Sequence, residues 1–150
     1  MGQTSYQSEL PMERLPYYAL YEPTSEGMKH TVRFNGLTQT GSFSIENPKM
    51  FSQVLMDQAG HCWFAEQLEP PKEMTNLYVF NSDGSFLKSL SVSGRPNLFE
   101  FGESVFAGCE GKDGQATIYE FTRKNLTLIH QWTVDGFFWG MERAGSRLYV

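Results

Sequence analysis

An internal repeat constrains this chain more than any other feature of its sequence. Three six-residue segments, each ending in glutamate, begin at Tyr17, His61 and Val105, so that successive starts are 44 residues apart. A fourth start, at Arg147, follows 42 residues later. A fixed period of this length indicates an array of similar supersecondary units, each packed against its neighbours.

Each repeat contains four short runs in which β-branched and aromatic residues predominate. The breaks between the runs carry turn residues, as in Asn81-Ser82-Asp83-Gly84. No longer window has a clean helical period. The pattern predicts four antiparallel strands per repeat. In the second repeat they cover residues 53–56, 61–67, 76–81 and 86–92, and in the third 97–101, 104–109, 116–122 and 127–134.

Four short antiparallel strands that recur at this spacing are typical of a β-propeller blade. The alternative, a plain sandwich of about a dozen strands, does not account for the equal spacing. The sequence therefore predicts an all-β fold, a partial β-propeller of about 3.5 four-stranded antiparallel blades with repeats of 42–44 residues.

The amino-acid sequence of the second repeat resembles the repeats of a known group of proteins. The segments in question are Asn76-Leu77-Tyr78-Val79-Phe80, then Gly84-Ser85-Phe86-Leu87-Lys88-Ser89-Leu90, then Gly94-Arg95-Pro96. Together they are similar to the blades of YVTN-type and quinoprotein-like β-propeller repeat proteins, a resemblance that extends over residues 17–150. Proteins of many functions share this blade pattern, so the resemblance implies the fold and no particular activity.

The repeats also suggest how the chain is divided. Residues 1–16 form an N-terminal segment, either an extra strand, with 6–10 as the candidate, or a linker, and residues 17–150 form the blades. Residues 17–45 supply three strands of a first blade, two complete blades follow, and a fourth has strands at 137–142 and 147–150. A closed ring needs roughly four to eight blades. We therefore expect either further blades in a longer polypeptide or a second copy that completes the ring.

Composition excludes several classes of partner. The net charge is −5 and the pI is near 5.2, so no basic surface for nucleic acid is expected. No apolar run is long enough to span a membrane, and the first residues do not form a signal peptide. The sequence fits either the cytoplasm or, if a leader has been removed, the cell envelope.

Cys62 and Cys109 are expected to be unpaired, because their strand positions place them too far apart for a disulfide.

Candidate binding residues gather at one predicted face. In a propeller the loops between successive blades and the loops between the second and third strands of each blade lie at the same edge. Glu22, Glu66 and Glu110 end equivalent strands there. Three such carboxylates could hold a divalent cation or a cationic ligand, although glutamates at strand ends are more often simply solvated. No dedicated cofactor or metal ligand set is predicted.

Three further residues are candidates for ligand binding. Arg95 and Lys49 lie in equivalent loops between blades and could bind an anion, unless they are rim residues without fixed partners. Trp139 belongs to the aromatic segment Phe137-Phe138-Trp139 and could stack on a ring-shaped ligand. Such an aromatic segment more often packs between blades.

Two classes of function fit these residues. The first is a non-catalytic binding or scaffolding module that recognises a protein, peptide or glycan at the loop face. The second is part of a propeller enzyme of the lactonase or quinoprotein-like kind. The first is favoured, because His30, His61 and His130 have no metal-ligand spacing and no nucleophile motif occurs. No catalytic residue is assigned.

Overall fold

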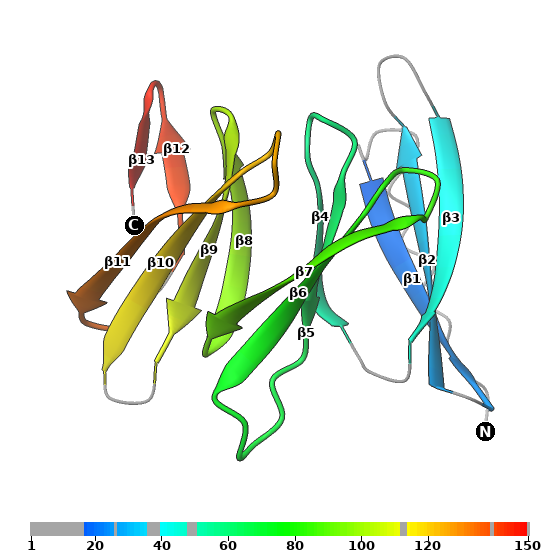
Figure 1. The fold of residues 1–150 in the computed structure, drawn as a ribbon, viewed down its shortest axis with the longest axis horizontal. Helices are drawn as coiled ribbons and strands as arrows, with labels where there is room; N and C mark the ends of the chain where they lie inside the picture. Colours follow the sequence, from blue (N-terminus) through cyan, green and yellow to red (C-terminus); the bar gives the residue numbers. More distant parts are fainter. Residues whose placement is uncertain are drawn as a thin grey trace, which may run out of the picture.

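The computed structural model describes residues 17–25, 27–35, 40–47, 51–111, 114–138 and 140–149. These residues form thirteen β-strands and no helix (Figure 1). The prediction of an all-β chain is thus confirmed. Within the same ranges, no helix is available that could cross a membrane.

The strands form four antiparallel sheets, and within each sheet they follow one another in chain order. Sheet A comprises β1 (Tyr17–Thr24), β2 (Gly27–Asn35) and β3 (Thr40–Asn47). Sheet B comprises β4 (Phe51–Met56), β5 (Cys62–Glu66), β6 (Met74–Phe80) and β7 (Phe86–Ser93). Sheet C comprises β8 (Arg95–Phe101), β9 (Ser104–Glu110), β10 (Gln115–Thr122) and β11 (Leu128–Asp135). Sheet D has two strands, β12 (Glu142–Ala144) and β13 (Arg147–Tyr149).

The predicted strands of the two middle repeats agree with sheets B and C to within a few residues. The expected strand at 137–142 is wrong for its described residues, because β12 begins only at Glu142. Gly136 and Gly140 both have positive φ angles, of 133° and 155°, which interrupt an extended strand before that point. The candidate strand at 6–10 lies outside the described residues.

Sheet B lies between sheets A and C, as Figure 1 shows, and packs on both. Between sheets B and C lies the larger core cluster, in which Trp63, Leu77 and Val105 have no exposed surface. On the opposite face of sheet B, Phe64 packs against Phe51 and contacts the ring of His30 from sheet A. Such burial of apolar side chains on both faces of a sheet is the main source of stability in the fold.

The strand pairing shows that the repeat is 43 residues in the second strand of each full sheet, one fewer than the sequence suggests. Trp63 packs from β5 toward sheet C. Ala107, 44 residues later, belongs to the same cluster and so points back toward sheet B. Phe106 is the position on β9 that points away from sheet B, because neighbouring side chains on a strand alternate between its faces.

The outer face of sheet C, the side that carries Phe106, Ile118, Trp132 and Val134, is only partly covered. Val92 on β7 is fully buried against sheet C, whereas the corresponding Val134 on β11 is 44% exposed. Trp132, the counterpart of Leu90, is also 44% exposed. Sheet D lies beside sheet C in Figure 1 but has only two short strands. The inner part of this face is covered where the ring of Phe138 lies against Gly108.

Both cysteines are free and buried, which confirms the expectation that they are unpaired. They lie in different core clusters, Cys62 on the side of sheet A and Cys109 between sheets B and C. Burial raises the pKa of the Cys109 thiol to about 12. Burial, and secondarily the negative charge of Asp57, raises the pKa of Cys62 even further.

These buried thiols predict a loss of stability at alkaline pH. The thiols stay protonated in the fold but ionise above pH ~8.5 in the unfolded chain. The free energy of unfolding should therefore fall as the pH rises past that value, by about 1.4 kcal/mol per pH unit for each cysteine. Urea unfolding from pH 8 to 10 would measure the slope. The variant Cys62→Ala/Cys109→Ala should show a shallower slope, and equal slopes would contradict the prediction.

Candidate functional site

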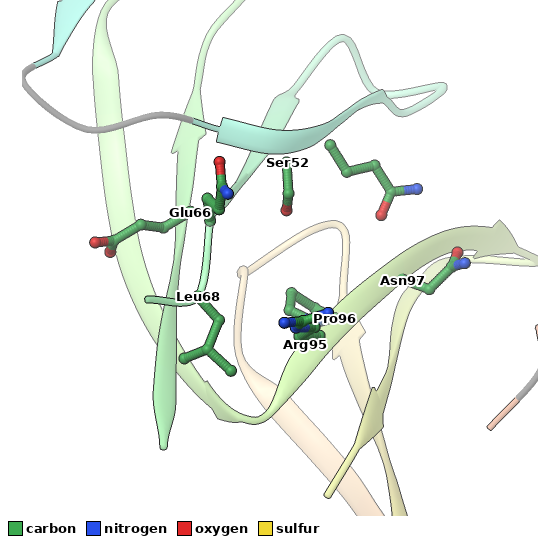
Figure 2. A pocket seen from close by; sticks show the side chains of 8 residues that line it. Ser52, Glu66, Leu68, Arg95, Pro96 and Asn97 are labelled. Atoms are coloured by element: carbon green, nitrogen blue, oxygen red, sulfur yellow. The ribbon is translucent and has the colours of Figure 1, made fainter. Parts of the chain in front are cut away.

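A pocket of about 560 Å³ opens at one edge of sheets B and C. It lies where β4 and β8 begin and where β5 ends, so it is at the edge that the sequence predicts for the loop face. Figure 2 shows Arg95 and Pro96 in the middle of the pocket, between Leu68 and Asn97. In the part of the chain that the structure describes, eight residues line it, namely Ser52, Gln53, Glu66, Gln67, Leu68, Arg95, Pro96 and Asn97.

Gln53 joins the two sheets at the pocket. Its side-chain oxygen accepts a hydrogen bond from the backbone N–H of Leu98, at 2.7 Å, and its side-chain nitrogen donates to the carbonyl of Leu98, at 3.3 Å. The side-chain amide of Gln53 thus makes the two hydrogen bonds to Leu98 that a neighbouring strand's backbone would otherwise make, and so connects β4 to β8. This pair of bonds fixes the distance between the two first strands and therefore the width of the pocket.

Glu66 is part of the pocket wall, but its charge is turned away from the pocket. The residue is 7% exposed. Its Oε2 accepts hydrogen bonds from Asn76 Nδ2, at 3.0 Å, and from the hydroxyl of Tyr78, at 3.3 Å. In Figure 2 its carboxylate points away from Arg95. Glu66 therefore acts as a structural acceptor on the side of β5 that faces sheet A.

The backbone around Arg95 is held firmly. Gly94 has a φ of 75°, and its N–H donates to the carbonyl of Glu73 at 2.8 Å. The carbonyl of Gly94 accepts a hydrogen bond of 2.5 Å from Thr75 Oγ1. A Cβ at position 94 would collide with the carbonyl oxygen of Glu110, so only glycine fits this close approach of two strands.

The side chain of Arg95, in contrast, is exposed. Its guanidinium makes no hydrogen bond or ion pair with any residue that the structure describes. Glu110 lies directly opposite Arg95 in the β8–β9 pair and is also exposed, yet the two do not form an ion pair. The pocket thus presents a free cation on a rigid backbone.

The other lining residues are polar but uncharged. Ser52 Oγ donates to the carbonyl of Ala65 at 3.3 Å, which leaves its oxygen available as an acceptor. Gln67 and Asn97 contribute exposed side-chain amides. Leu68 and Pro96 supply the apolar surface. A ligand here would meet one positive charge, several hydrogen-bonding groups and a small apolar area.

The structure brings two of the six sequence candidates together, namely Glu66 and Arg95. Glu22 and Glu110 are exposed and lie outside the pocket lining. The expectation that Glu66 and Glu110 occupy equivalent positions is wrong, because the 43-residue register places Glu66 and Glu110 on opposite faces of their sheets. Lys49 and Trp139 lie outside the described residues.

Sequence reasoning missed the residues that shape the pocket. Ser52, Gln53 and Asn97 carry no motif, and nothing in the sequence indicates that the amide of Gln53 reaches the next sheet. The sequence weakly indicates that Gln67 and Leu68 lie at the pocket, since they directly follow a strand that ends at the predicted loop face.

A second polar centre lies in the turn between β4 and β5, at the other end of these strands. Asp57 is buried, and its Oδ1 accepts hydrogen bonds from the N–H groups of Ala59 and His61, both at 2.9 Å. Its Oδ2 accepts a bond of 2.9 Å from Trp63 Nε1 and lies 3.3 Å from His61 Nδ1. Because every contact is internal to the turn and its flanking strand, this centre is structural.

Comparison with family models, with curated proteins and with solved structures finds no match to this chain. In the ranges that the structure describes, no group of three or more His, Cys, Asp or Glu side chains is arranged to hold a metal ion.

Proposed function

We propose that this chain is a β-propeller-type binding module in which sheets A to D are successive blades. Two consecutive four-stranded meanders have the same strand order, and the second packs on the first as a next blade would. Their first strands, β4 and β8, are joined through Gln53, as neighbouring strands around a channel would be. The blade-level resemblance to YVTN-type and quinoprotein-like repeat proteins supports the same arrangement.

The outer face of sheet C is expected to have a partner. On the outer strand, a position that is buried in sheet B is exposed at its counterpart in sheet C, as Val92 and Val134 illustrate. A further sheet of the same kind would cover Trp132 and Val134, supplied by additional blades of a longer polypeptide or by a second copy. Exposed apolar strands at a sheet edge favour such pairing.

The chain of 150 residues is therefore expected to self-associate. The variant Trp132→Lys/Val134→Lys should shift it toward the monomer, because charges on the outer face of sheet C oppose burial. Light scattering coupled to size exclusion at increasing concentration would measure the effect. Leu87→Lys, which alters an exposed apolar residue on the outer strand of sheet B, is the matched control. A monomer at all concentrations would contradict this expectation.

The recognition site of the module is the pocket lined by Arg95, and its partner is a protein, peptide or glycan. The observation that carries this assignment is an exposed guanidinium on a fixed backbone, without a partner among the described residues, within a pocket at the loop edge. Pockets of roughly 300–1,000 Å³ with a few polar groups are the usual form of small binding sites.

Binding of the labelled protein to peptide and glycan arrays would test the function. The wild type is expected to bind a subset of ligands that Arg95→Ala no longer binds, while Arg147→Ala, at an exposed arginine on β13, retains them. Ligands that bind all three proteins equally, or no ligands at all, would contradict the assignment. The enzyme alternative predicts instead a rise in Tm with Ca²⁺ or Mg²⁺, through linkage to a metal site.

A further inference from the structure

Among the residues that the structure describes, one sets the charge of the pocket. Among the eight lining side chains only Glu66 and Arg95 ionise, and the carboxylate of Glu66 is buried and bonded to Asn76 and Tyr78. The charge that the described lining presents to a ligand is therefore the positive charge of Arg95. Exposed amides of Gln67 and Asn97 add hydrogen-bond donors without adding negative charge.

We propose that the group recognised in this pocket is a carboxylate of an acidic peptide, bound by the guanidinium of Arg95; this inference rests on the proposed function. A guanidinium presents two parallel N–H groups that match the two oxygens of a carboxylate. The carboxylate arises from an Asp or Glu side chain or from the C-terminus of the peptide.

The lining favours a peptide over an acidic sugar. Sugar sites commonly stack a ring of the ligand on an aromatic side chain, and none of the eight lining residues is aromatic. Leu68 and Pro96 instead offer small apolar surfaces next to the amides. This combination suits the mixed apolar and amide surface of a peptide backbone and its neighbouring side chains.

The backbone around Arg95 is already ordered before such a ligand binds. The hydrogen bonds at Gly94 and the ring of Pro96 fix the backbone on both sides of Arg95, so that little backbone order has to be gained on binding. Glu110 is the nearest competing carboxylate in the strand pair, and it leaves the guanidinium free. A peptide that adds contacts to Ser52, Gln67 or Asn97 would outcompete it.

The test uses a capped probe peptide, acetyl-Gly-Glu-Gly-amide, titrated into ¹⁵N-labelled protein. We expect saturable shifts of the Arg95 Nε–H signal and of the amide signals of Gln53 and Gln67. The matched probe with Gln in place of Glu should bind at least about tenfold more weakly, since a tenfold change corresponds to loss of a single good polar interaction. A third probe with a free C-terminus and no Glu separates the two sources of carboxylate.

Two variants and one sugar complete the experiment. Arg95→Gln should lose the binding while its Tm stays unchanged, and Arg147→Gln should bind as the wild type does. Equal binding of the Glu and Gln probes, retained binding by Arg95→Gln, no saturation by either carboxylate probe, or preference for glucuronate would each overturn the inference. An array ligand that is neutral and still depends on Arg95 would overturn the carboxylate while leaving the proposed function intact.

Discussion

Replacement of Trp63 by alanine is expected to destabilise the protein by about 3–5 kcal/mol, the largest effect of any single change considered. Trp63 is fully buried between sheets B and C, with its ring 5.9 Å from that of Phe121. Its removal leaves a cavity in the main interface between sheets and leaves the Oδ2 atom of Asp57 without its indole donor.

Urea unfolding followed by circular dichroism would measure this loss. Leu87→Ala provides the control, because Leu87 is 39% exposed and lies away from the outer face of sheet C, so that its truncation should change the free energy of unfolding much less. Trp63→Phe should fall between the two, since it keeps most of the packing but loses the hydrogen bond. A loss below about 1 kcal/mol for Trp63→Ala, the scale of an ordinary surface change, would contradict the packing of sheet B on sheet C.

Replacement of Asp57 by alanine is expected to cost about 3 kcal/mol, because one buried and two partly buried donors lose their acceptor at once. The side chain of Asp57 has no exposed surface. The N–H groups of Ala59 and His61 and the indole of Trp63 would all be left without this partner. The turn that sets the register between β4 and β5 would then lose its organising group.

Asp83→Ala is the matched control for this prediction. Asp83 also organises a turn, where its Oδ1 accepts bonds from the N–H and the hydroxyl of Ser85 at 2.8 and 2.6 Å. These bonds hold the pKa of Asp83 below its usual value, but the carboxyl is exposed. Its loss should therefore cost clearly less in the free energy of unfolding. Equal losses for the two variants would mean that Asp57 is not a buried structural centre.

The strands were predictable because their signals are local. Tyr78 and Phe80 alternate with Leu77 and Val79 in a run of strand-forming residues, and Gly84 closes the turn that follows. The register between repeats was not predictable to the residue. Leu55 on β4 pairs with Trp63, eight residues later. Phe99, which lies 44 residues after Leu55, pairs with Phe106, only seven residues later, so the match from β5 to β9 is 43 residues.

The candidate site was predictable in location but not in chemistry. Arg95 was found because a Gly-Arg-Pro segment between repeats has to lie at the loop edge. Glu66 was identified for its charge, yet burial and two donors on β6 give it a structural role that no local pattern reveals. Gln53 binds Leu98, a residue 45 positions away, and such a long-range contact becomes visible only once the sheets are stacked.

A crystal structure of the protein bound to the Glu probe peptide would test the central claim most directly. It should show the probe carboxylate on the guanidinium of Arg95, between the start of β4, the end of β5 and the start of β8. It should also show β4, β8 and β12 arranged around one axis, with a further sheet covering Trp132 and Val134. A probe seated elsewhere, for example beside the Asp57 turn, or sheets without a common axis, would contradict a propeller-type module that recognises its partner at this pocket.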